Sequence, residues 1–180
     1  VIMKKSLLFA LIGGVIIFVW QFISFAIPNF HKAGMEYTPA QDEILAALEK
    51  SGLEEGMYML GQADPELPKE EYDVAMKAYE GKPWGILNYQ EDSTMSMPLN
   101  MVRGFIIAIV VSLIFFWVIR QQKDPTLMKR VLLGVGIGFI GFLFVPYTNF
   151  IWFREPDIWA YMLDGVAPWA ILGFVGHKMA

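Results

Sequence analysis

Four long apolar segments dominate the sequence and restrict what the chain can fold into. Each contains about 19–23 residues, and roughly 20 helical residues cross the hydrocarbon core of a bilayer. Inside a bilayer every backbone polar group must be paired within the protein, so helices are the expected form. The sequence therefore predicts an α-helical integral membrane protein with four transmembrane helices. The segments are residues 6–27, 99–119, 131–153 and 158–176.

The third and fourth segments are less uniform than the first two. Asn149 and Asp164 interrupt them, and each contains one proline, Pro146 or Pro168. Prolines kink helices because they remove a backbone donor. Two interpretations therefore stay open for residues 158–176, a full membrane span or a re-entrant segment.

The first segment has features of a signal peptide. Lys4 and Lys5 provide a positive start, but the apolar stretch that follows is longer than the usual 7–15 residues. We therefore expect residues 1–27 to form transmembrane helix 1 as an uncleaved signal anchor. Residues 99–180 are expected to form transmembrane helices 2–4.

Positive charges set the expected orientation, because cytoplasmic loops of membrane proteins are rich in Lys and Arg. Lys and Arg gather before the first segment, in the connection at residues 120–130, and at Lys178 after the fourth segment. The short loop on the opposite side has Arg154 as its only basic residue. We therefore expect a multi-pass protein of a bacterial-type inner (plasma) membrane with both termini cytoplasmic.

The connection between the first two segments, residues 28–98, is long and acidic. It contains 14 Asp and Glu against 5 Lys, whereas the rest of the chain has 4 acidic and 9 basic residues. This division fits an extracytoplasmic insert, and it excludes the basic surface that nucleic-acid binding needs. The pattern predicts a small α+β domain that has little core and packs on the membrane helices or a partner. Its elements are a helix over residues 38–52, a strand over 56–60, a helix over 69–81 and a strand over 83–90.

The third segment contains GIGFIG, which matches the G-x-G-x-x-G pattern of dinucleotide-binding loops. That fingerprint requires a preceding strand and a soluble helix, whereas this stretch lies inside an apolar run. Gly134, Gly138 and Gly141 are spaced by four and three residues, so they share one helical face. Small residues at this spacing let membrane helices approach closely, and we interpret the three glycines as a helix-packing surface.

A strongly polar residue lies near the expected outer end of every apolar segment. With a rise of 1.5 Å per residue, the four lie roughly 6–9 Å below the outer boundary and form one layer. Ionisable groups at this depth usually find partners, so Arg103 and Asp164 are the expected pair. The layer is either a ligand-binding pocket open to the outer leaflet or a structural clamp that aligns the helices. Its residues are Gln21, Arg103, Asn149 and Asp164.

Several kinds of chemistry are excluded or unsupported. The chain has no Cys, which excludes disulfides, thiolate metal centres and cysteine nucleophiles. His31 and His177 are expected on opposite sides of the membrane, at the surface or the lipid headgroups, so they cannot share one metal ion. The sequence contains no motif of a known catalytic or metal site. Catalysis is therefore not favoured and no cofactor is predicted, although the polar layer is compatible with a bound lipid or quinone.

Binding is the favoured function. The sequence suggests a non-enzymatic accessory or scaffold subunit of a bacterial-type membrane or envelope complex, with other membrane protein subunits and lipid as partners. The glycine-rich third segment and the acidic insert are the expected contact surfaces. The alternative is a small transporter, or a lipid- or quinone-binding membrane protein that uses the outer-leaflet polar layer.

Overall fold

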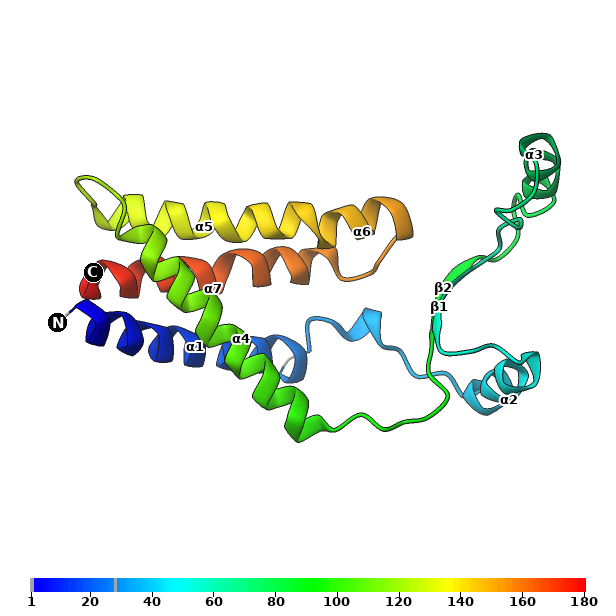
Figure 1. Ribbon diagram of the computed structural model, residues 1–180, viewed down its shortest axis with the longest axis horizontal. Helices are drawn as coiled ribbons and strands as arrows, with labels where there is room; N and C mark the ends of the chain where they lie inside the picture. The colour runs from blue at the N-terminus through cyan, green and yellow to red at the C-terminus, as the bar shows by residue number, and fades with distance from the viewer. Residues whose placement is uncertain (1, 28) are drawn as a thin grey trace. The chain divides into compact units, whose positions relative to one another are not determined.

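The structure is a computed structural model that describes residues 2–27 and 29–180 and is mostly helical (Figure 1). The chain divides into two compact units. Unit 1 consists of Val1–Glu36 and Met95–Ala180, and unit 2 of Tyr37–Thr94. Unit 2 is thus shorter than the predicted insert, whose first residue, Pro28, lies outside the described residues.

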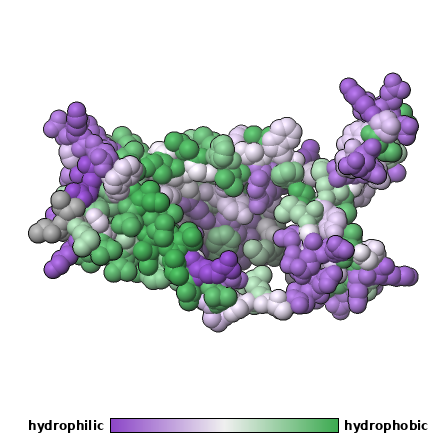
Figure 2. Space-filling model, viewed as in Figure 1, coloured by the Kyte–Doolittle hydropathy of each residue, from purple (hydrophilic) through white to green (hydrophobic). Residues whose placement is uncertain are grey.

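Unit 1 is built from apolar helices. Four helical segments are long and apolar enough to cross a membrane, which indicates a multi-pass membrane protein. Figure 2 shows apolar residues over most of the visible face of these helices and hydrophilic residues at their ends. The helices are α1 (Ile2–Ala26), α4 (Met97–Ile119), α5 (Leu127–Phe144), α6 (Pro146–Phe153) and α7 (Ile158–Met179).

The two prolines have different effects on the helices. Pro146 ends the α5 hydrogen-bond pattern, so the third predicted segment consists of two helices, α5 and α6. Thr148 Oγ1 donates to the carbonyl oxygen of Leu143 across this break, at 3.2 Å. Pro168, in contrast, lies inside α7, which continues for 22 residues. Residues 158–179 therefore form one continuous helix, which is long and apolar enough to cross a membrane.

Helix α5 packs most closely against α7, and glycines make this possible. A Cβ atom at Gly138 would overlap the carbonyl oxygen of Gly165, and one at Gly134 would overlap the carbonyl oxygen of Trp169. Gly141 differs, because no other described part of the chain lies within 4 Å of a Cβ built there. The close face therefore contains Gly134 and Gly138, whereas Gly141 is exposed and takes no part in it.

Helix α1 packs against α4 in a similar way. A Cβ at Gly13 would come within 2.6 Å of Ser112 Oγ, and one at Gly14 within 2.7 Å of the Ile109 side chain. The core lies where α1, α4 and α7 meet, and the rings of Phe9 and Phe116 stack there with centroids 4.5 Å apart. Burial of such side chains from water and lipid fixes the rotation of each helix about its axis.

Unit 2 has the order helix, strand, helix, strand that the sequence predicts. The two strands pair antiparallel, and Gly56 lies opposite Tyr89. Among the residues of unit 2, all of which the structure describes, Ala63 alone is buried. Unit 2 therefore has almost no core of its own. Its elements are α2 (Gln41–Ser51), β1 (Gly56–Leu60), α3 (Lys69–Lys77) and β2 (Gly85–Tyr89).

Candidate functional site

Asp164 is the centre of a polar cluster between α1 and α7. Trp20 Nε1 and Ser24 Oγ both donate to Asp164 Oδ1, at 2.9 and 2.7 Å. His31 Nε2 lies 2.9 Å from the other carboxylate oxygen, Oδ2. The side chains of His31 and Asp164 are 3% and 18% exposed. Three donors thus surround one largely buried carboxylate, and we call these four residues the Asp164 cluster.

The α1 side of the cluster follows from helix geometry. Trp20 and Ser24 are four residues apart, so both side chains lie on the same face of α1. That face is turned toward α7, where Asp164 lies in the second turn of the helix. One face of α1 therefore supplies two donors to the same carboxylate oxygen.

His31 reaches the cluster because the chain turns back after α1. The backbone N–H of Phe30 donates to the carbonyl oxygen of Ser24 at 2.8 Å, which closes the turn. A single 3₁₀ turn, Lys32–Gly34, follows, and Gly34 N–H donates to Asp157 Oδ2 at 2.7 Å. Residues 29–36 are therefore bonded to α7 and to the loop before it, which explains why they belong to unit 1.

Two aromatic rings hold the imidazole of His31 in place. The ring of Phe25 stacks on it with a centroid distance of 3.9 Å and an interplanar angle of 6°. The ring of Tyr161 meets it edge-on, with a centroid distance of 4.6 Å and an angle of 63°. Stacked and edge-on contacts of this kind fix ring orientation as well as burying apolar area. The imidazole thus has one defined direction, with Nε2 toward Asp164.

The hydrogen-bond order excludes a serine nucleophile of the Ser–His–Asp type. In that arrangement the histidine lies between the other two and removes the serine proton. Here Ser24 and His31 both bond to Asp164, so the carboxylate lies in the middle. The second imidazole nitrogen, Nδ1, is buried and has no partner among the described residues. The cluster can therefore hold a carboxylate between two apolar helices, but it cannot activate Ser24.

The other residues of the predicted polar layer lie elsewhere. Gln21 and Arg103 are exposed on α1 and α4, and Asn149 is half-buried on α6. The expected pairing of Arg103 with Asp164 does not form among the described residues, since the ion pair of Asp164 is with His31. The physical reason is that α4 packs mainly against α1 and only slightly against α7, which leaves the Arg103 side chain exposed. Of the predicted layer, only Asp164 belongs to the cluster.

Sequence reasoning missed three of the four members of the Asp164 cluster. The spacing of Trp20 and Ser24 on one face of α1 is a signal that could have identified them. No such signal exists for His31, because its position depends on the turn after α1 rather than on a helical period. The part of the chain that the structure describes contains no group of three or more His, Asp or Glu that could hold a metal ion.

The chain was compared with known protein families, with curated proteins and with solved structures, and none of them matches it.

Proposed function

We propose that the chain is a non-enzymatic accessory or scaffold subunit of a membrane protein complex. In this proposal its four helices anchor it in a bacterial-type inner membrane, both termini are cytoplasmic, and unit 2 contacts a partner subunit outside the cytoplasm. The observation that carries the proposal is the lack of a core in unit 2. Ala63 alone is buried there, while many large apolar side chains remain exposed.

Three exposed apolar residues of unit 2 share one face of its sheet. Met59 lies opposite Ile86 in the pairing of β1 with β2, and Met57 lies two residues away on the same face. Met57 is 73% exposed, and Met59 and Ile86 are also exposed. An isolated two-stranded sheet is marginally stable in water, so a partner that covers this face would stabilise it. We call these three residues the sheet face.

The charge of unit 2 indicates what kind of partner fits. Residues 37–94 contain 13 Asp and Glu against 4 Lys, a net charge of −9. A second copy of unit 2 would carry the same negative charge and would be repelled. A basic protein surface, in contrast, is complementary to the charge of unit 2. At α3, an open groove of about 510 Å³ is lined by both apolar and acidic side chains, namely Leu67, Glu70, Glu71, Val74 and Ala75. We therefore propose a partner subunit with a basic and partly apolar surface.

The Asp164 cluster supports the same function. The His31–Asp164 hydrogen bond, together with the bond from Gly34 N–H to Asp157, fastens residues 29–36 to unit 1 just before unit 2 begins. The carboxylate has three donors, which is what a structural clamp requires. Such a clamp suits a scaffold subunit, because it fixes the segment of unit 1 from which the chain continues into unit 2.

The proposal is tested by native mass spectrometry of the protein, purified from its own membrane in mild detergent. We expect a stoichiometric complex with at least one other polypeptide. Met59→Glu places a charge on the sheet face and should release that polypeptide. Gln90→Glu adds the same charge at an exposed position after β2 and should leave the complex intact. A protein that is found alone, or a complex that both variants retain, would contradict the proposal.

A second candidate is a small transporter or a lipid- or quinone-binding protein that uses the Asp164 cluster. One observation favours it. His31 Nδ1 is buried without a partner among the described residues, beside a carboxylate at membrane depth, and such groups mark proton pathways in membranes. Release of a quinone from the purified protein, and its loss in His31→Ala, would favour this function over the first.

A further inference from the structure

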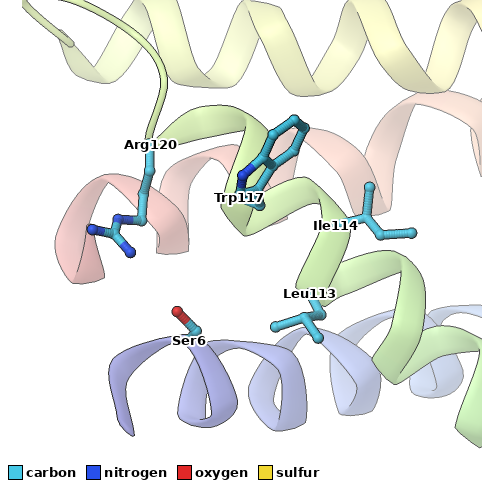
Figure 3. A pocket seen from close by; sticks show the side chains of 5 residues that line it. All are labelled: Ser6, Leu113, Ile114, Trp117 and Arg120. Atoms are coloured by element: carbon cyan, nitrogen blue, oxygen red, sulfur yellow. The ribbon is translucent and has the colours of Figure 1, made fainter. Parts of the chain in front are cut away.

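An open groove runs between α1 and α4, near the end of α1 opposite to that which carries Trp20 and Ser24. It has a volume of about 350 Å³ and is lined by side chains from both helices (Figure 3). Most of its lining is apolar, and Trp117 is 65% exposed within it. An exposed apolar groove on a transmembrane helix pair faces lipid rather than water. The lining residues are Ser6, Leu113, Ile114, Trp117 and Arg120.

The groove is polar at one end and apolar at the other. Figure 3 shows Arg120 and the hydroxyl of Ser6 at one end, and Leu113 and Ile114 at the other. Arg120 directly follows the last residue of α4, and the seven steps of the chain from Leu113 to Arg120 cover about 10 Å at the rise of a helix. The groove therefore reaches from the expected headgroup level into the acyl-chain region.

The polar end carries a concentrated positive charge. The guanidinium carbon of Arg120 lies 6.0 Å from the ring centroid of Phe116, a residue that is itself buried. This contact holds Arg120 in place over a fixed ring. Lys4 and Lys5 directly precede Ser6 on α1, and both are exposed. Arg120 lines the groove, and Lys4 and Lys5 lie within one helical turn of Ser6, so three cationic residues lie at or near this end.

We propose that this groove binds one anionic phospholipid. The phosphate is held by Arg120, whose planar guanidinium donates two parallel N–H groups to phosphate oxygens. An acyl chain lies along Leu113 and Ile114, and Trp117 lies at the boundary between headgroup and chain, where tryptophan is favoured. A soluble anion would leave the apolar half of the groove uncovered. A phospholipid without net charge would leave the neighbouring lysines unmatched.

The test is lipid retention, measured by native mass spectrometry after the purified protein is mixed with phosphatidylglycerol or with phosphatidylcholine. We expect one bound phosphatidylglycerol and much weaker retention of phosphatidylcholine. Arg120→Gln should lower the affinity for phosphatidylglycerol about fivefold, the usual effect of one basic residue beside an anionic membrane surface. Arg120→Lys keeps the positive charge, so its affinity for phosphatidylglycerol should fall less than that of Arg120→Gln.

Arg103→Gln is the matched control, because Arg103 is an exposed arginine near the other end of α4. It should leave phosphatidylglycerol retention unchanged. A second variant, Ile114→Trp, fills the apolar half of the groove and should reduce retention without changing any charge. Equal retention of the two lipids would overturn the proposal, and so would equal losses in Arg103→Gln and Arg120→Gln. The thermal stability of each variant is measured as well, and lipid retention is compared only among variants that are as stable as the wild type. A folding defect is then not mistaken for a loss of lipid binding.

Discussion

His31 Nε2 lies 2.9 Å from Asp164 Oδ2, although the two residues are 133 positions apart in the chain. The contact joins the segment that leaves α1 to the last helix, and Trp20 and Ser24 bond to the same carboxylate. Because three donors meet at one acidic group, the carboxylate of Asp164 is the group on which the whole cluster depends.

Replacing Asp164 by leucine should destabilise the protein strongly. Leucine is similar in size but accepts no hydrogen bond, so the donors of Trp20, Ser24 and His31 all lose their acceptor. One unsatisfied buried donor costs about 1–3 kcal/mol, so we expect a loss of about 3 kcal/mol or more. Asp164→Asn should cost about 1 kcal/mol, because the amide oxygen still accepts from α1. Thermal unfolding in detergent, followed by circular dichroism, measures both, and equal stability of Asp164→Leu and the wild type would contradict a clamp.

His31→Ala should loosen the segment after α1 more than the rest of the molecule. Without the imidazole, residues 29–36 keep their backbone bond to Asp157 but lose the contacts with Asp164, Phe25 and Tyr161. We expect faster amide hydrogen exchange at residues 30–34, while the exchange of α5 stays unchanged. Lys32→Ala is the control, because Lys32 is an exposed neighbour. If both variants exchange like the wild type, His31 does not hold this segment.

The glycines of α5 allow a comparison within one helix. A leucine at Gly138 would collide with the backbone of Gly165 and separate α5 from α7, whereas a leucine at Gly141 meets open space. Overpacking typically costs about 1–3 kcal/mol, and a clash with backbone should cost at least that much. We therefore expect Gly138→Leu to lower the unfolding temperature clearly and Gly141→Leu to leave it nearly unchanged. Similar unfolding temperatures for the two variants would contradict the observed packing of α5 on α7.

The elements were predictable because they depend on local patterns. Strand β1 has the predicted bounds, and the prediction of four apolar helices is confirmed. Gly52 has a positive φ of 69° and ends α2, as its lack of a Cβ predicts. The break at Pro146 likewise follows from the missing backbone donor. In each case the cause lies within a few residues of the effect.

The composition of the polar cluster was not predictable in the same way. Counting residues from the expected outer end of each apolar segment puts Gln21, Arg103 and Asp164 at one predicted level of the bilayer. This count does not say how each helix is rotated or which helices are neighbours. Arg103 is exposed because α4 packs mainly on α1, and that choice depends on packing across the whole bundle. His31 required knowledge of the turn that Phe30 closes with Ser24.

The orientation of α4 can be tested directly, because the chain has no Cys of its own. Thr94 precedes α4, and Lys123 follows it, so single cysteines there report on opposite ends of one span. The excess of Lys and Arg after α4 predicts that this end is cytoplasmic. A membrane-impermeant maleimide should therefore label Thr94→Cys in intact cells, and Lys123→Cys only after permeabilisation. The wild type is the background control, and the reverse labelling pattern would contradict the proposed orientation.

Trp20→Phe isolates a single hydrogen bond of the Asp164 cluster. Phenylalanine keeps an aromatic ring on α1 but lacks the Nε1–H group that donates to Asp164 at 2.9 Å. We expect a loss of about 0.5–1.5 kcal/mol in the free energy of unfolding, the net contribution of a typical hydrogen bond. In the Asp164→Leu background the indole N–H has already lost its acceptor, so removing it should cost little or be favourable.

A double-mutant cycle over Trp20→Phe and Asp164→Leu therefore separates this bond from the packing of the indole ring, because the two residues are in contact. The double variant should lose ~1 kcal/mol less stability than the sum of the losses in the two single variants. A cycle with Trp84→Phe, a tryptophan of unit 2, serves as the reference and should show no coupling to Asp164. If the Trp20 cycle is additive, the indole acts through its size alone, and the cluster has two working donors rather than three.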